Sequence, residues 1–158
     1  MRSKKAPRRI LSPDPIYGSK LLTRFINRIM IDGKKTIAQR LVYNALNQIK
    51  EEQKQDPLKV FETAIANVSP KMEVRPRRVG GASYQVPSEV RGDRKESLAI
   101  RWLIASASAR PNKEFKSFDK KLAAEFIEAA AGSGGAMKKK EDIQKQAAAN
   151  RAFSHFRW

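Results

Sequence analysis

Apolar residues recur every three or four positions along six stretches of the chain, which is the spacing of one face of an α-helix. In the first stretch, Leu22, Phe25, Ile26 and Ile29 share such a face. The predicted helices cover 19–31, 35–53, a stretch between Asp56 and Ser69, 93–109, 117–131 and 136–152. The pattern therefore predicts a mainly α protein with one six-helix domain.

The other five helices each carry their own apolar residues, and these residues are expected to form the core. They are Leu41, Ala45, Leu46 and Ile49; Phe61, Ala64, Ile65 and Val68; Leu98, Trp102 and Ala105; Leu122, Phe126, Ile127 and Ala130; and a thin face at Ile143 and Ala147.

Short polar, Pro and Gly signals separate the predicted helices. Gly33, after Asp32, is expected at the C′ position of the first helix. Asp56 followed by Pro57 predicts an N-cap with Pro at the first helical position. Ser69-Pro70 ends the third helix, Pro111 the fourth, and a glycine cluster at 132–135 ends the fifth.

Residues 72–90 break the helical pattern and predict a β-hairpin. Gly80 and Gly81 separate two β-capable runs, and such tight turns need positive φ. Pro76 and Pro87 remove backbone donors, so neither strand can lie inside a larger sheet. Arg75, Arg77 and Arg78 lie on the first run; Arg91, Arg94 and Lys95 follow the second. We interpret this hairpin as a protruding arm that reaches into a polyanion.

Charge supports that interpretation. The 158 residues include 33 Lys and Arg against 16 Asp and Glu, giving a net charge of +17. Such a charge opposes compaction unless a polyanion neutralises it. Nucleic acid is the leading partner, and an anionic membrane surface is second. Residues 1–15 are predicted to be a disordered basic tail that orders on RNA, and 16–158 a single domain carrying the arm.

Several other functions are not supported by the sequence. The chain has no cysteine, so disulfides, zinc–thiolate sites and thiol nucleophiles are excluded, and a reducing compartment is expected. No apolar run reaches the roughly 20 residues of a membrane span. The basic N-terminus lacks the apolar core of a secretory signal.

No catalytic constellation is evident, so no enzyme activity and no cofactor or metal are expected. His155 is the only histidine and has no acidic neighbour. Residues 33–36 (GKKT) resemble the end of a phosphate-binding loop, but Arg28 replaces its first glycine and Lys35 its hydroxyl residue. Lys34 and Lys35 could still hold a phosphate at the N-terminus of the second helix, or simply be solvated.

The choice between RNA and DNA depends on shape. A basic tail, a ribbon and a basic helix face suit an irregular RNA surface. Tyr84 could stack on a base or pack against the root of the arm, whereas Trp102 is expected in the core. Arg94, Arg101 and Arg110 could line the outward face of the fourth helix. A DNA-compacting architectural protein is the second hypothesis, and an RNA-modifying enzyme is the third.

Five segments, in order, resemble the bacterial or organellar form of the ribosomal protein S7 family. They are ILSPDPIYGS, SKLLTRFINRIMIDGKKTIAQRLVYNA, VRPRRVGGASYQVPSEVR, LAIRWLI and ANRAFSHFRW. The match runs almost end to end. The resemblance implies a fold of six helices with a hairpin arm.

The resemblance also implies a function and a location. The protein would bind the 3′ head domain of small-subunit ribosomal RNA, nucleate head assembly, and lie near the exit site beside transfer RNA, messenger RNA and neighbouring small-subunit proteins. It would reside on the ribosome, in the cytoplasm or in an organelle. The implied RNA contacts are Arg2, Lys4, Lys5, Arg8, Arg9, Lys34, Lys35, Arg75, Arg77, Arg78, Gly80, Gly81, Tyr84, Arg91, Arg94, Lys95 and Arg101.

The chain departs from the family pattern at three places. Gly92-Asp93 stands where a more basic, Pro-containing link is usual. Residues 144–147 lack the usual His, Arg and Met pattern, and Phe156 stands where Tyr is common. The first departure weakens the expected phosphate contact at that link, and the other two weaken the expected contacts of the C-terminal helix relative to those of the hairpin.

Overall fold

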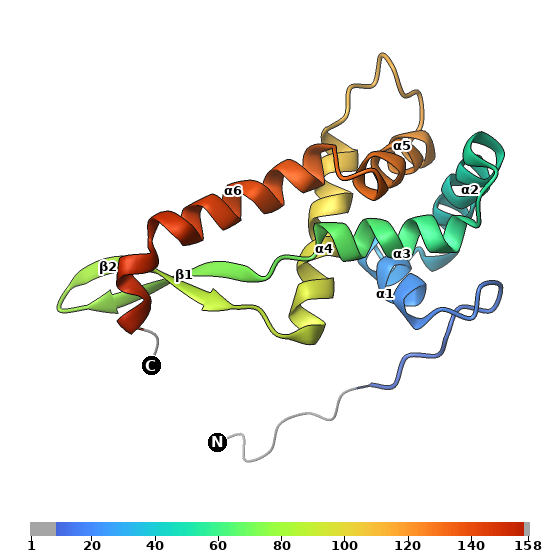
Figure 1. The fold of residues 1–158 in the computed structure, drawn as a ribbon. Coiled ribbons are helices and arrows are strands. Elements are labelled where there is room, and N and C mark those ends of the chain that lie inside the picture. The colour runs from blue at the N-terminus through green and yellow to red at the C-terminus, as the bar shows by residue number, and fades with distance from the viewer. Residues whose placement is uncertain (1–8, 157–158) are drawn as a thin grey trace. The chain divides into compact units, whose positions relative to one another are not determined.

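The computed structural model describes residues 9–156 of the chain. This part is mainly helical with one antiparallel hairpin, which confirms the predicted fold class (Figure 1). The elements are α1 (Lys20–Ile29), α2 (Lys35–Gln53), α3 (Pro57–Val68), β1 (Met72–Val79), β2 (Ala82–Glu89), α4 (Gly92–Ala109), α5 (Phe118–Ala130), α6 (Gly135–Ala149) and the 3-10 helix η1 (Arg151–Phe156).

The chain divides into two compact units between Arg40 and Leu41, within α2. Each unit is described by itself. A single domain from residue 16 onward stays a prediction, and most of the predicted tail, residues 1–8, lies outside the described residues.

In the first unit, Ser19 caps α1 by accepting a hydrogen bond on Oγ from the Leu22 N–H at 3.4 Å. Leu22, Phe25 and Ile26 are buried as predicted. The predicted end of this helix is wrong, because Met30 already leaves the helical conformation. Gly33 is therefore not at C′. Its φ of +72° instead shapes the link into α2, where the Gly33 carbonyl accepts from the Lys35 N–H.

The second unit contains a helical body made of α3, α4 and α5. Asp56 caps α3 as predicted, accepting from the Leu58 N–H at 3.1 Å. Phe61 of α3 and Phe126 of α5 are fully buried, and their rings meet edge to face with centroids 5.3 Å apart. Large rings packed in this way supply most of the apolar burial that stabilises such a body.

Several predicted core residues of the second unit are not buried, and a nearby residue on the same helix is buried instead. In α2, Leu41 is half-buried whereas Val42 is fully buried. In α4, Ala105 is exposed and Trp102 half-buried. The buried residues of α4 are Leu98, Ala99, Ile100, Leu103 and Ala107. The wider buried stripe of small and aliphatic residues shows that α4 is covered on more than one side.

In α5, the predicted core residues Ile127 and Ala130 are only half-buried, and two charged residues, Lys121 and Glu125, are buried instead. Periodicity of apolar residues alone could not place them, because a charge is buried only where a partner compensates it. Both partners lie outside α5.

One of those partners is Arg110, which was expected on the outward face of the fourth helix. That prediction is wrong. The Arg110 side chain is only 14% exposed, and its guanidinium donates to Glu125 at 2.6 Å and to Glu128. The hydrogen bond with Glu128 is the main cause that raises the pKa of Arg110, opposed by burial and reinforced by Glu125. Lys121 Nζ donates to the Arg110 carbonyl and to Asn112 Oδ1, each at 2.6 Å.

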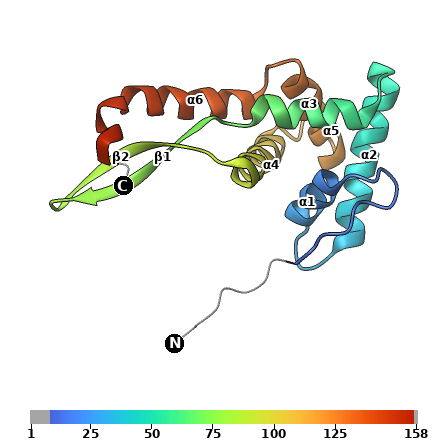
Figure 2. The same cartoon turned by 60° about the horizontal axis from the view of Figure 1, so that its bottom comes forward.

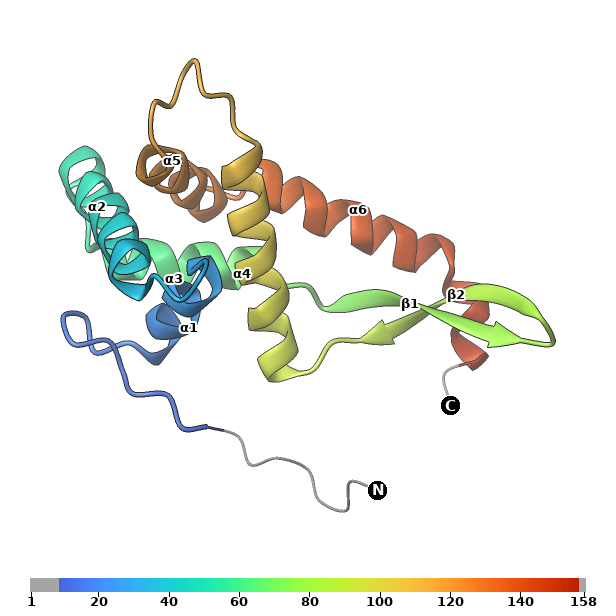
Figure 3. The same cartoon turned by 180° about the vertical axis from the view of Figure 1, so that it is seen from behind.

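The same network fixes the start of α6. Glu125 Oε1 accepts from the Ala136 N–H at 2.9 Å, which satisfies one of the free amides of the first helical turn. Gly134 precedes the helix with φ +92°, and a Cβ there would lie 3.0 Å from a Glu128 oxygen. From this start, α6 runs alongside the hairpin in all three views (Figures 1, 2 and 3).

The C-terminal helix is shorter than predicted. It ends at Ala149, and the chain then tightens into η1 rather than continuing to residue 152. Ala147 is buried and Ile143 half-buried, which confirms its thin apolar face. The change of helix type brings the aromatic residues of η1 onto β2, as described below.

Candidate nucleic-acid interface

The hairpin forms as predicted. Gly80 and Gly81 have φ values of +58° and +89°, so the two-residue turn is of the type that only glycine, asparagine or aspartate adopt readily. Val79 pairs with Ala82 beside the turn, and Pro76 pairs with Gln85. The two strands form a sheet of their own, so neither proline interrupts an inner strand.

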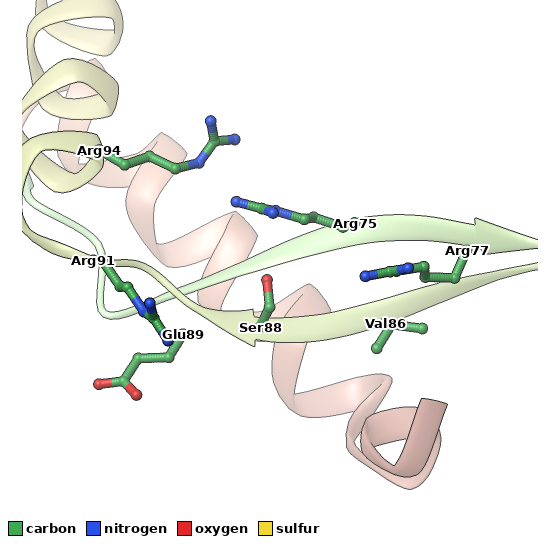
Figure 4. Close-up of a pocket in the computed structure, with 7 residues that line it drawn as sticks. All are labelled: Arg75, Arg77, Val86, Ser88, Glu89, Arg91 and Arg94. Atoms are coloured by element: carbon green, nitrogen blue, oxygen red, sulfur yellow. The ribbon is translucent and has the colours of Figure 1, made fainter. Parts of the chain in front are cut away.

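A cavity of about 450 Å³ opens where the hairpin joins the helical body (Figure 4). It is lined by Arg75 and Arg77 of β1, by Arg91 and Arg94 at the start of α4, and by Val86, Ser88 and Glu89 of β2. Four arginines around one cavity make a strongly positive site. Arginine offers several N–H donors in one plane, a geometry suited to phosphate oxygens.

The pleat of β1 explains how two of these arginines reach one cavity. Alternate residues of a strand point to the same face, so Glu73, Arg75 and Arg77 share a face. Arg75 lies opposite Val86, and Glu73 lies opposite Ser88, in the antiparallel register. Ser88 Oγ is buried and has no hydrogen-bond partner within the described residues.

Two arginines of the cavity are held by an acid. Glu73 is only 6% exposed, and its carboxylate accepts from both Arg75 and Arg94. Arg94 approaches most closely through Nε and Nη2, each 2.8 Å from Oε2. Arg77, Arg78 and Arg91 are exposed and form no ion pair with the described residues.

The remaining predicted contact residues fall in three places. Lys95 and Arg101 on α4 are half-buried, and Arg101 Nε donates to the Ser97 carbonyl at 3.3 Å. In the other unit, Arg9, Lys34 and Lys35 are exposed, the last at the first residue of α2. Arg2, Lys4, Lys5 and Arg8 lie outside the described residues.

Tyr84 joins an aromatic cluster that sequence reasoning missed. Its ring lies 5.2 Å from Phe153 and 5.3 Å from Phe156, both in η1, and it is half-buried. His155 is exposed and its ring lies 4.0 Å from Phe156. The available signal was the concentration of aromatic residues in the last six positions of a chain with only 8% aromatic residues.

Glu73 and the β2 residues of the cavity were also missed. The signal for Glu73 was its spacing, because an acid two residues before Arg75 on a strand shares a face with it. For Val86, Ser88 and Glu89 the sequence offered none, since their place at the cavity depends on the register.

Other chemistry finds little support in the part of the chain that the structure describes. No group of three or more His, Cys, Asp or Glu residues is arranged there to hold a metal ion. None of the helices described is both long and apolar enough to cross a membrane.

Fold and site together define a class: a small basic helical protein that exposes arginines on a hairpin and at the start of the adjoining helix. Residues 1–151 match the family model described as Ribosomal protein S7p/S5e. The chain therefore belongs to the S7 family of ribosomal proteins, which confirms the resemblance inferred from its motifs.

Curated relatives agree along the whole chain. The small ribosomal subunit protein uS7 of Carboxydothermus hydrogenoformans is 57% identical over 152 residues, or 96% of each chain. The uS7 proteins of Thermotoga neapolitana and Thermotoga maritima are 54% and 52% identical over 158 residues, the full length of each. Proteins of this family are structural and non-enzymatic, so membership confirms that the chain is not an enzyme.

Proposed function

We propose that this chain is a structural constituent of the small ribosomal subunit that binds the 3′ head domain of its ribosomal RNA directly. The observation that carries the proposal is the arginine-lined cavity at the root of the hairpin. A cavity with four guanidinium groups and one exposed acid, Glu89, fits a bend of phosphate backbone far better than an apolar ligand.

The exposed length of the hairpin extends this surface. Arg77 and Arg78 are free of ion pairs within the described residues, and the Gly80-Gly81 tip carries no side chains that would keep a backbone at a distance. A ribbon of this kind suits the irregular grooves and loops of folded RNA, which expose phosphates and 2′-hydroxyls.

In the other unit, Lys34 and Lys35 add a second candidate contact. They stand exposed at the N-terminus of α2, where free backbone amides and the helix dipole favour a phosphate. Arg9 and the preceding basic residues would extend contact along the RNA. We assign these residues to ribosomal RNA, as the family pattern implies.

The finer parts of the proposal concern assembly. Early binding to the head domain would nucleate its assembly, with neighbouring small-subunit proteins then joining. The hairpin tip would lie near the exit site and approach transfer RNA and messenger RNA. The support is that the tip and the outer residues of β1 are exposed, so they remain available after the root of the hairpin is occupied.

The test is equilibrium binding of the purified protein to a transcript of the head-domain RNA at 50 and 200 mM salt. Duplex DNA of equal length serves as competitor. Six to ten phosphate contacts predict about a thousandfold loss of affinity or more between these salts on the duplex-DNA scale, and somewhat less for folded RNA. Binding that survives excess DNA supports the proposal. Equal competition by DNA would refute specific recognition and favour a DNA-architectural protein.

A further inference from the structure

Glu73 stands out on β1 because it is a buried acid on a strand that also carries three exposed arginines. Residues 75–78 of the same strand are open to solvent and Val74 is half-buried, whereas Glu73 is only 6% exposed. Burying a carboxylate is costly unless cations compensate it. Arg75 and Arg94 provide that compensation.

The contacts of Glu73 join two separate elements. Arg94 Nε lies 2.9 Å from Oε1 and 2.8 Å from Oε2, so the first turn of α4 is tied to β1. Arg75, two residues along β1, donates to Oε1. Figure 4 shows the Arg75 and Arg94 guanidiniums approaching each other from the hairpin and from the helix. Without an acid between them, two like charges this close would repel and separate.

Both arginines keep capacity for a ligand. Their side chains remain 51% and 47% exposed, and both line the cavity. A guanidinium carries five N–H groups. The bonds to Glu73 use only Nε and Nη2, so Nη1 of each arginine has no protein partner within the described residues.

We propose that Glu73 is a positioning residue for RNA binding: it holds Arg75 and Arg94 as a preformed pair that takes one backbone phosphate. The inference rests on the proposed function and adds to it an acid that promotes the binding of a polyanion. Side chains already fixed in the bound geometry lose less conformational freedom when the ligand arrives, which raises affinity.

A positioning role for Glu73 predicts an effect on RNA affinity opposite to the effect expected from its charge alone. Removing an acid from a phosphate-binding surface should tighten binding, because one repulsive charge disappears. Glu73→Gln should instead weaken binding to the head-domain transcript about fivefold, because the two arginines separate. The matched control is Glu89→Gln. Glu89 lines the same cavity, is exposed and makes no ion pair within the described residues, so this variant should bind about twofold tighter.

A double-mutant cycle separates positioning from a loss of stability. Arg94→Ala should weaken binding about tenfold in the wild-type protein and less than about threefold in the Glu73→Gln background, since Arg94 is no longer held there. Arg78→Ala should cost the same factor in both backgrounds, because Arg78 does not contact Glu73. Thermal unfolding of each variant shows that the folded proteins are being compared.

Glu73→Gln binding as tightly as wild type, or more tightly, would overturn the inference. Equal costs of Arg94→Ala in the two backgrounds would also overturn it. If Glu73→Gln does not fold, Arg94→Lys replaces it: lysine keeps the charge but lacks the planar edge of two nitrogens, Nε and Nη2, that Arg94 presents to Glu73. Binding about threefold weaker then supports the inference, and unchanged binding rejects it. Failure of the wild-type protein to bind the transcript would instead refute the proposed function, and this inference with it.

Discussion

The helical body and the hairpin arm of the second unit are built on opposite principles. The body, α3 with α4 and α5, buries rings and aliphatic chains such as Phe61, Leu103 and Phe126 completely. The arm exposes residues 75–78 of β1 and buries only a few residues near its root, among them Val86 and Glu73. Stability is therefore concentrated in the body, and the residues available to a ligand are concentrated in the arm.

The difference teaches that the arm depends on attachments rather than on a core of its own. An isolated two-stranded hairpin is only marginally stable in water. Here Glu73 ties it to α4, α6 runs alongside it, and η1 packs on Tyr84. Changes in the body should thus alter folding, and changes in the arm should alter binding.

The largest effect on the body side of the comparison is expected from Phe126→Ala. Removing a fully buried ring that packs on Phe61 should lower the free energy of unfolding by about 3–5 kcal/mol. Chemical denaturation of the purified variant measures it. A loss below about 1 kcal/mol would mean that the body is not the main source of stability.

Breaking the buried network of Arg110 with Glu125 should cause the second-largest loss of stability. Arg110→Ala leaves Glu125, which is 1% exposed, without its cation, and should cost about 3 kcal/mol of stability. The control is Arg91→Ala, an exposed arginine, for which about 0.5 kcal/mol or less is expected. Equal unfolding midpoints for the two variants would contradict the assigned burial.

On the arm side, replacing Arg75, Arg77 and Arg78 together with Ala should weaken RNA binding about a hundredfold and reduce the salt slope by about two to three. The three side chains are exposed and Glu73 keeps Arg94 as its cation, so helicity should hardly change and the unfolding temperature should fall only slightly. The measurements are a salt titration of binding and circular dichroism on heating. Loss of the fold would show that the hairpin belongs to the core.

The smallest effect concerns the attachment between η1 and the hairpin. Replacing Phe153 and Phe156 with Ala removes both ring contacts of Tyr84, worth about 1 kcal/mol. Amide exchange in β1 and β2 should accelerate about fivefold, while amides of α3 and α5 keep their protection. His155→Ala, at an exposed position, should change exchange much less.

Local signals predicted much of the fold. The bounds of α2, the Asp56 cap and the Gly80-Gly81 turn each depend on a few adjacent residues, so each could be predicted from the sequence alone. The basic hairpin was located for the same reason. Where the prediction failed, the deciding partner lay elsewhere in the chain.

Arg110 illustrates the failure. Its outward placement was reasonable from the helix alone, but Glu125 and Glu128 of the next helix draw it inward. The cavity shows the same limit, because Glu73 and Arg94 are 21 residues apart and meet only once the hairpin folds back. Lys140 donating to the carbonyl of Asn67, 73 residues away, is a further case.

The hydrogen bond from the Ala136 N–H to Glu125 fixes the direction of the α6 axis. A helix of 15 residues such as α6 is about 22 Å long, so it acts as a lever. A tilt of about 10° at Gly134 would displace the far end by about 4 Å, nearly the spacing between neighbouring strands. The rings of η1 would then miss Tyr84. The buried Glu125 carboxylate thus limits how far the axis of α6 can tilt, and so determines where η1 meets the hairpin.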